Sequence, residues 1–258
     1  MNWDNPGRVF ISGASSGIGR EFAIQLSKQG FKPVIHGRRK KKLEELREEI
    51  YKNTSIECEI ITGDLSDRKE IFRITDIIRE YNDLDILINN AGFGLMSAFA
   101  LLDLSENLAM LDVHITAMIC FTHAALQKMI KKRKGVIINV SSVASFNNTG
   151  SEDIMYPSTK QFQYIFSENL HMTLKKFGIK IQALCPGLTH TEIHSREKMK
   201  GFPLEQLPEN LWMSVEDVVS QSLGAFQNDS VIFIPGEMNK NNARRLLENK
   251  MKEAEKFL

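Results

Sequence analysis

Short apolar segments alternate with longer amphipathic segments along almost the whole chain. Each apolar segment is too short for a normal helix and is bounded by Gly, Asn, Asp or Pro, which predicts a strand. The seven predicted strands are residues 9–11, 33–35, 56–61, 86–88, 136–138, 179–181 and 231–234. The amphipathic segments predict helices over about 17–29, 40–52, 67–81, 106–132, 156–177 and 214–227, and a C-terminal helix over 239–258.

The alternation of strands with helices implies right-handed βαβ units and a parallel sheet with helices on both faces. Strands covered on both faces should be almost entirely apolar, and the predicted strands over 86–88 and 136–138 contain apolar residues alone. No proline-rich linker, repeat or low-complexity stretch divides the chain, so we predict one doubly wound α/β domain over residues 1–258. The irregular stretch 187–212 is predicted to be an insertion that binds substrate.

Composition and charge exclude several classes of protein. The 258 residues carry 33 Lys plus Arg against 32 Asp plus Glu, a balance that argues against nucleic acid or anionic membrane as partner. Three separated cysteines without CxxC spacing predict neither a disulfide framework nor a zinc site, and we expect no metal. The sequence also shows no signal peptide, and no apolar run approaches the roughly 20 residues that cross a bilayer. We therefore expect a cytoplasmic protein.

A glycine-rich turn follows the first predicted strand and precedes a helix. Gly13, Gly17 and Gly19 would permit a tight turn, close approach of a pyrophosphate, and close packing of the helix on the sheet. The N-terminus of that helix offers free N–H groups and a partial positive charge to an anion. The alternative is a βα loop without a ligand. The spacing is GxxxGxG, which differs from the common GxGxxG dinucleotide motif.

The end of the second predicted strand indicates which cofactor is bound. A carboxylate there would bind the 2′-hydroxyl of NAD, but residues 36–42 read His-Gly-Arg-Arg-Lys-Lys-Lys. The helix dipole opposes basic residues at a helix start, and a 2′-phosphate would explain them, with Arg38 as its bidentate partner and Arg39 beside it. The alternative is a solvated helix start paired with glutamates one turn later. We expect NADP rather than NAD.

Tyr156 and Lys160 are four residues apart on a predicted helix and so lie on one face. A tyrosine with a pKa near 10 needs a nearby cation before it can act as a base at neutral pH, and Lys160 would supply one. The pair alone is weak evidence, because the chain has 33 Lys plus Arg and four tyrosines. Its context strengthens it, since Ser142 ends the fifth predicted strand, where a hydroxyl can stabilise a developing oxyanion.

With these motifs the chain resembles the short-chain dehydrogenases/reductases over almost its whole length. The motifs are SGASSGIG at 12–19, GDL at 63–65, NNAG at 89–92, NVSS at 139–142, YPSTK at 156–160 and PGLTHT at 186–191. The resemblance implies a Rossmann-like, seven-stranded parallel sheet, a nicotinamide dinucleotide, a small carbonyl or alcohol substrate, and a homodimer or homotetramer. The basic residues after the second strand are similar to those of NADP-preferring members.

The resemblance also implies a role for each matching residue. Tyr156 would be the acid–base, Lys160 would lower its pKa and bind the ribose, and Ser142 would orient the substrate oxygen. The residues expected to bind the cofactor, besides Tyr156 and Lys160, are Gly13, Ser15, Ser16, Gly17, Ile18, Gly19, Arg38, Arg39, Asp64, Leu65, Asn90, Ala91, Gly92, Pro186, Gly187, Thr189 and Thr191.

Two departures from the family pattern leave alternatives open. His114 stands where most members have an asparagine that supports the proton relay, so it would either hold a relay water or pack as a buried imidazole with satisfied partners. Ser142 precedes Tyr156 by 14 residues instead of 13, which leaves Ser141 as an alternative orienting residue. We predict an NADP-dependent oxidoreductase that interconverts a carbonyl compound and its alcohol. The alternative is a catalytically inert NADP-binding sensor or scaffold of the same fold.

Overall fold

Seven parallel strands form one sheet in the computed structural model, which describes residues 5–95, 98–146, 153–192, 207–227 and 230–257. The strands run in the order β3-β2-β1-β4-β5-β6-β7, and every neighbouring pair is parallel. Their bounds are β1 Arg8–Ile11, β2 Lys32–Gly37, β3 Glu59–Thr62, β4 Leu84–Asn89, β5 Gly135–Val140, β6 Ile179–Leu184 and β7 Ile232–Phe233. The predicted Rossmann-like α/β sheet is confirmed, and its strand order reverses between β1 and β4, where such sheets bind ligands.

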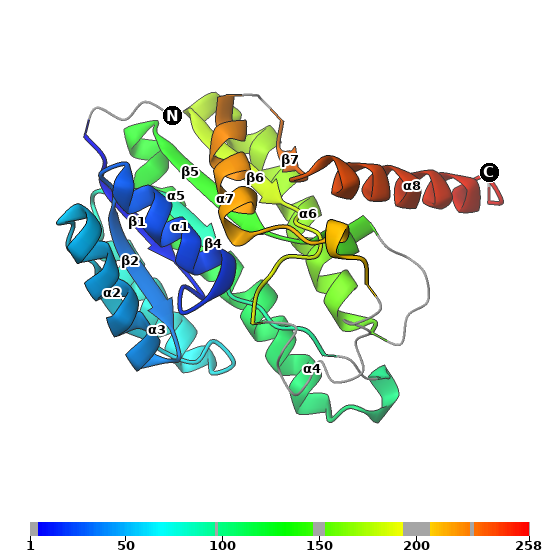
Figure 1. Ribbon diagram of the computed structural model, residues 1–258, viewed down its shortest axis with the longest axis horizontal. Helices are drawn as coiled ribbons and strands as arrows, with labels where there is room; N and C mark the ends of the chain where they lie inside the picture. The colour runs from blue at the N-terminus through cyan, green and yellow to red at the C-terminus, as the bar shows by residue number, and fades with distance from the viewer. Residues whose placement is uncertain (1–4, 96–97, 147–152, 193–206, 228–229, 258) are drawn as a thin grey trace.

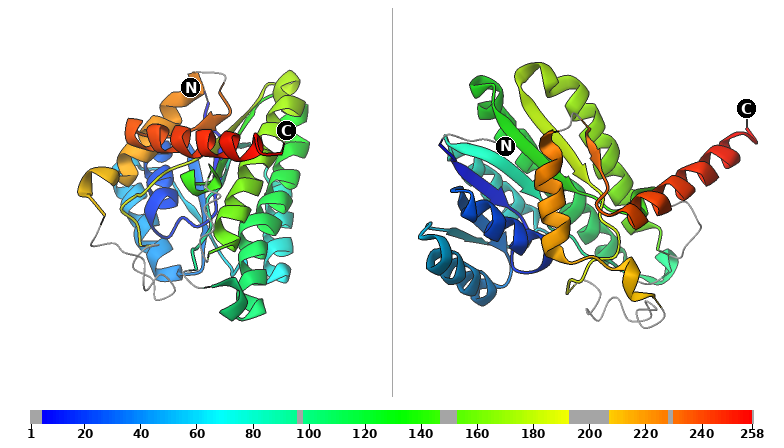
Figure 2. Two further views of the ribbon diagram at one scale, coloured as in Figure 1. Left: turned by 90° about the vertical axis from the view of Figure 1, so that its right-hand side faces the viewer. Right: turned by 45° about the horizontal axis from the view of Figure 1, so that its top comes forward.

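Helices cover both faces of this sheet (Figure 1). On one face, apolar side chains of α1, α2 and α7 pack in a single core cluster, and on the other face those of α3, α5 and α6 do. The bounds of these helices are α1 Gly17–Lys28, α2 Lys40–Thr54, α3 Arg68–Glu80, α5 Ala117–Lys132, α6 Met155–Leu174 and α7 Val215–Gly224. The C-terminal helix α8, Glu237–Ala254, extends away from the sheet (Figures 1 and 2).

The longest helical stretch differs from the predicted helix over 106–132. It consists of α4 (Leu104–Leu111), a π-helical turn (Asp112–Thr116) and α5. Such turns often occur at functional sites, and this one contains His114. By length and composition alone, this stretch is the one among the described residues that is long and apolar enough to cross a membrane, but half of its apolar window is buried inside the fold. A helix of a protein core can have the same length and composition, so this stretch alone does not indicate a membrane span, and the cytoplasmic location stays a prediction.

The predicted insertion over 187–212 is described at its two ends, whereas 193–206 lie outside the described residues. The ends are joined, because His190 N–H donates to the Met213 carbonyl oxygen and Met213 N–H donates to that of Leu188, both at 3.0 Å. A short 3-10 turn, Glu209–Leu211, precedes this junction. Between Ser142 and Tyr156, residues 147–152 also lie outside the described part of the chain. The insertion therefore begins and ends beside the C-terminal end of β6.

Candidate active site

The glycine turn after β1 packs directly on the segment that follows β4. Gly13 has φ +71°, and a Cβ at this position would stand 2.8 Å from the Cα of Ala91. A Cβ on Gly19 would stand 2.4 Å from Asn90 Nδ2, so a side chain there would separate α1 from the β4 end. Glycine is therefore required at both positions by close packing, as the sequence argument expected for the turn and the helix start.

Hydrogen bonds lock the same two segments together. The Ser12 hydroxyl oxygen accepts the backbone N–H groups of Asn90 (3.0 Å) and Ala91 (3.1 Å). In return, Asn90 Nδ2 donates to the carbonyl oxygens of Ser12 (2.9 Å) and Gly13 (3.1 Å). The Asn90 side chain thus shapes the turn, and its expected contact with the cofactor stays a prediction. Sequence reasoning missed Ser12, although its place at the end of the first strand, facing the NNAG motif, was a usable signal.

The two arginines after β2 have different partners. Arg39 lies over the glycine turn: its Nη2 donates to the hydroxyl oxygens of Ser15 (3.0 Å) and Ser16 (2.8 Å), and its Nη1 pairs with Glu192 Oε2 at 2.6 Å. Arg38 points to the neighbouring strand end, where its Nη1 pairs with Asp64 Oδ2 at 3.2 Å. Arg39, and not Arg38, is therefore the arginine that contacts the predicted phosphate turn in this structure.

Asp64 and Leu65 follow β3 at the edge of the same rim. Asp64 Oδ1 accepts the backbone N–H (3.0 Å) and the hydroxyl (2.9 Å) of Ser66, and Leu65 is buried. Burial alone would raise the pKa of Asp64, but the hydrogen bonds from Ser66 and Arg38 outweigh it and lower the pKa. Asp64 is therefore a carboxylate at neutral pH and stands next to Arg38.

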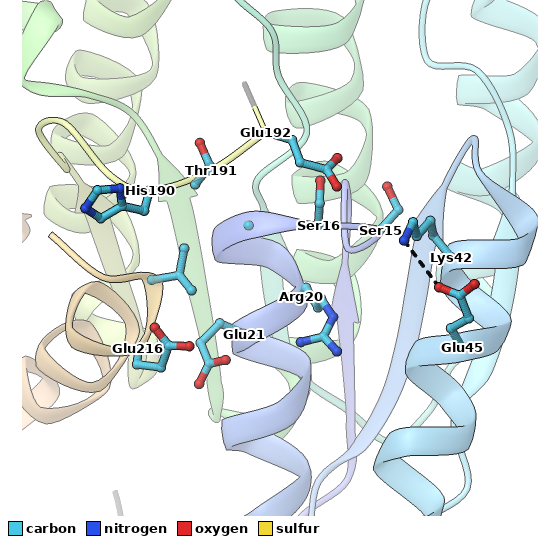
Figure 3. A pocket seen from close by; sticks show the side chains of 12 residues that line it. Ser15, Ser16, Arg20, Glu21, Lys42, Glu45, His190, Thr191, Glu192 and Glu216 are labelled. Carbon is cyan, nitrogen blue, oxygen red and sulfur yellow. Dashed lines mark ion pairs between the residues drawn. The ribbon is translucent and has the colours of Figure 1, made fainter. Parts of the chain in front are cut away.

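A pocket of about 520 Å³ opens beside the glycine turn (Figure 3). Four predicted cofactor residues line it: Ser15, Ser16, Gly17 and Thr191. The rest of its wall comes from α1, α2, the start of α7 and the loop after β6, as Arg20, Glu21, Lys42, Glu45, His190, Glu192, Val215 and Glu216. Lys42 and Glu45, three residues apart on α2, form an ion pair at 3.4 Å in this wall. This pocket adjoins the phosphate end of the predicted cofactor site.

The remaining predicted cofactor residues lie around the same rim. Ile18 packs against the core beneath α1. The Pro186 carbonyl oxygen accepts the N–H of Val143 at 2.9 Å, and the Thr189 hydroxyl donates to the Gly187 carbonyl oxygen at 3.0 Å. The first contact holds the loop after β6 against the loop after β5, and the second lies within the loop after β6.

Ser142, Tyr156 and Lys160 converge at the ends of β5 and α6. Lys160 Nζ lies 5.5 Å from the centre of the Tyr156 ring, and Ser142 is a polar neighbour of the phenol that acts to lower the pKa of Tyr156. Ser141 faces elsewhere, because its buried hydroxyl donates to the Lys160 carbonyl oxygen at 2.7 Å. Asp153 accepts the N–H of Tyr156 at 3.1 Å at the start of the helix. Of the two candidate serines, Ser142 is thus the one beside the phenol.

The pKa values of the pair follow from burial. Burial raises the pKa of Tyr156 to about 12, with Ser142 acting against this and the Asp153 charge adding to it. Burial also lowers the pKa of Lys160 to about 8. The expected lowering of the Tyr156 pKa is therefore not found here. The reason is geometric, because Lys160 Nζ donates to the Val140 carbonyl oxygen (2.8 Å) and to Gln163 Oε1 (3.1 Å), not to the phenol.

His114 is a buried imidazole with both ring nitrogens occupied. Its Nε2 accepts the N–H of Phe93 at 3.0 Å, so its Nδ1 carries the proton and donates to the Thr159 hydroxyl at 2.8 Å. Burial and then the Lys160 charge lower the pKa of His114 well below its usual value. A Cβ on Gly92 would stand 3.0 Å from His114 Nε2, so the NNAG segment closes over this ring. The structure favours the packed imidazole over a water-holding histidine.

Comparison with known proteins gives a consistent result. The short chain dehydrogenase family model matches residues 8–200. An uncharacterized oxidoreductase of Staphylococcus saprophyticus is 31% identical over 184 residues, which cover 71% of this chain and 78% of that protein.

Solved structures agree over nearly the whole length. A short-chain dehydrogenase from Sphingobium yanoikuyae in complex with NADPH is 26% identical with a TM-score of 0.84, covering 96% of this chain and 95% of that one. A bulky-bulky ketone specific alcohol dehydrogenase from Comamonas testosteroni is 27% identical with a TM-score of 0.81, at the same coverage. The glycine turn, the tyrosine–lysine pair and these matches together make the chain a member of the short-chain dehydrogenase family of oxidoreductases.

Proposed function

We propose that this protein is an NADP-dependent oxidoreductase that interconverts a carbonyl compound and its alcohol, with Tyr156 as the acid–base. The observation that carries the proposal is the convergence of Ser142, Tyr156 and Lys160 at the C-terminal edge of the sheet, where a Cβ on Gly92, in the segment packed on the glycine turn, would stand 3.6 Å from Lys160 Nζ. The relatives include proteins described as an NADPH complex and as a ketone-specific alcohol dehydrogenase, which agrees with it.

The residues present fit a dinucleotide with a 2′-phosphate. The N-cap Ser16 of α1 makes no side-chain capping hydrogen bond, so its hydroxyl does not occupy the backbone N–H groups that begin this helix. Arg39 stands over this helix start together with Ser15 and Ser16, a donor set suited to a phosphate. A bound nicotinamide dinucleotide would supply or accept the hydride.

The chain's own residues would handle the proton. In carbonyl reduction the protonated phenol of Tyr156 would donate to the substrate oxygen, and Ser142 would hold that oxygen by its hydroxyl. The raised pKa of Tyr156 keeps the phenol protonated at neutral pH, which is the state that reduction requires. Lys160, charged below its pKa of about 8, would favour the phenolate left after transfer.

We propose that two copies of the chain associate through α5 and α6. Exposed apolar side chains gather on these helices and on α4, among them Leu108, Ile119, Phe162, Ile165 and Met172. Scattered single apolar residues are normal on a surface, but several on neighbouring helices are typical of an interface. The assembly would be a homodimer or homotetramer.

The decisive experiment is a turnover assay. Purified protein is mixed with NADPH and a panel of ketones and aldehydes, and NADPH consumption is followed at 340 nm. Cofactor binding with turnover of at least one carbonyl, abolished in Tyr156→Phe, supports the proposal. Tight NADPH binding without turnover of any compound would identify the inert sensor or scaffold instead.

A further inference from the structure

The Lys160 ammonium is buried without a described carboxylate within salt-bridge distance. Its two hydrogen-bond acceptors are both neutral: the Val140 carbonyl oxygen at 2.8 Å and Gln163 Oε1 at 3.1 Å. The titratable groups that interact with it are His114 from the π-helical turn, Cys185 after β6 and Tyr156 on its own helix. A buried cation in such surroundings depends on its acceptors to stay charged.

Gln163 connects this ammonium to the π-helical turn. It is buried on α6, three residues after Lys160, and its Nε2 donates to the His114 carbonyl oxygen at 2.9 Å. Its backbone is also held, because the Ser167 hydroxyl donates to the Gln163 carbonyl oxygen at 2.7 Å and accepts from Asn139 Nδ2 at 2.9 Å. The Gln163 carboxamide therefore bridges Lys160 and the π-helical turn that contains His114, the residue that differs from the usual asparagine of the family.

The chemistry of a carboxamide fixes the orientation of this bridge. Its oxygen only accepts and its nitrogen only donates, while the Lys160 ammonium only donates and the His114 carbonyl oxygen only accepts. Turning Gln163 over would place donor against donor and acceptor against acceptor. A water in the same place could act as donor or as acceptor toward either neighbour and so pass a proton. The amide cannot, and it holds the Lys160 ammonium and the His114 carbonyl oxygen in fixed positions.

We propose that Gln163 is a positioning residue for the Tyr156–Lys160 pair, holding the charged lysine against the π-helical turn and beside the tyrosine ring. The catalytic consequence rests on the proposed function, but the contact itself does not. It follows that Gln163 helps to set the pH above which Lys160 loses its proton. It also follows that no proton passes from Lys160 to the His114 carbonyl through this bridge.

The first test is the pH profile of kcat/KM in carbonyl reduction. Gln163→Met keeps the side-chain length but removes the hydrogen-bond acceptor of Lys160. The fall of kcat/KM at high pH, the alkaline limb, is set by loss of the Lys160 proton. In this variant it should begin about one pH unit lower, since a hydrogen bond to a charged group is worth about one pKa unit or more. Gln163→Glu adds a negative charge, so the limb should move up. Thr173→Ala is the matched control: it removes a hydroxyl-to-carbonyl hydrogen bond of the same kind near the C-terminal end of the same helix, without a partner in the Gln163 bridge, and should leave the limb in place.

The second test needs no turnover. The free energy of unfolding in urea is measured from pH 6 to 10.5 for two pairs of proteins. The first pair is the wild type and Lys160→Met; the second pair is Gln163→Met and the double variant Gln163→Met/Lys160→Met. Because the pKa of Lys160 is lower in the folded state, the unfolded chain binds more protons between about pH 8 and 10.5, and stability relative to Lys160→Met should rise across this window. In the Gln163→Met pair the rise should start about one pH unit lower.

Equal onsets in the two pairs, or a shift of the alkaline limb in Thr173→Ala equal to that in Gln163→Met, would overturn the proposal. If Gln163→Met does not fold, the Gln163→Glu pair replaces it, and its onset must move to higher pH. If the wild type binds NADPH but turns over no carbonyl, the proposed function fails and the unfolding measurements alone decide the role of Gln163.

Discussion

Replacing Arg39 by alanine should weaken the binding of NADP and leave that of NAD nearly unchanged. Arg39 is the arginine over the glycine turn, where it contacts the hydroxyls of Ser15 and Ser16 at 3.0 and 2.8 Å. A 2′-phosphate held there would receive charge-assisted hydrogen bonds from the guanidinium, and NAD has no such phosphate. The loss should therefore show as a change in cofactor preference and not as general weakening.

The size of the effect follows from the exposure of the site. A charge-assisted hydrogen bond is typically worth about 1.5–3 kcal/mol, or roughly ten- to 150-fold in affinity. The Arg39 side chain is 41% exposed, and solvent screens its charge, so the lower end of this range is expected. Arg39 is also paired with Glu192, at 2.6 Å, and the phosphate must replace this contact. Glu192→Gln should thus strengthen NADP binding by up to about fivefold, the value of an exposed ion pair.

Isothermal titration with NADP and with NAD at one fixed salt concentration measures these changes. Arg38→Ala is the matched control, because Arg38 carries the same charge but pairs with Asp64. If Arg38→Ala weakens NADP more than Arg39→Ala does, the sequence-based choice of Arg38 as phosphate partner is right and the contacts of Arg39 are incidental. Equal weakening of both cofactors by Arg39→Ala would refute the reasoning altogether. Raising the salt should narrow the difference between the cofactors.

Three further predictions concern turnover, pH dependence and assembly. Tyr156→Phe should bind NADPH normally and lose about 100-fold or more in kcat, since only the proton-transferring oxygen is removed; near-normal kcat excludes it as the acid–base. The pKa of His114 is lowered in the folded state, so the unfolded chain binds more protons below about pH 6.5, and His114 should lower the stability to urea as the pH drops from there, by up to about 1.4 kcal/mol per pH unit. His114→Asn should remove this contribution and leave that of His36, whose pKa burial lowers to about 4, so the slope should decrease; an unchanged slope argues against a neutral buried imidazole at position 114. Sedimentation velocity should give a dimer or tetramer for the wild type and smaller species for Phe162→Glu, whereas a wild-type monomer contradicts the proposed interface.

Local patterns in the sequence were enough to predict the sheet, which the structure confirms, and to bring the candidate site residues to one edge of it. Apolar runs such as 86–88 and 136–138 are strands: a strand covered on both faces is apolar throughout, and these runs are too short for a normal helix. The carboxyl ends of parallel strands meet at one edge, so motifs far apart in the chain had to come together there. Ser142 and Tyr156 could be assigned to one site for that reason, before any distance was known.

The choice of partner for each polar side chain was decided only by the tertiary structure. Arg38 and Arg39 are neighbours in the sequence, yet one reaches Asp64 and the other the glycine turn. Gln163 donates a hydrogen bond to the carbonyl oxygen of His114, 49 residues away in the sequence. That oxygen lies in a π-helical turn that the periodicity of the sequence did not predict. Hydrogen bonds act over about 3 Å and depend on direction, so their partners are set by how helices and loops pack, which no local pattern encodes.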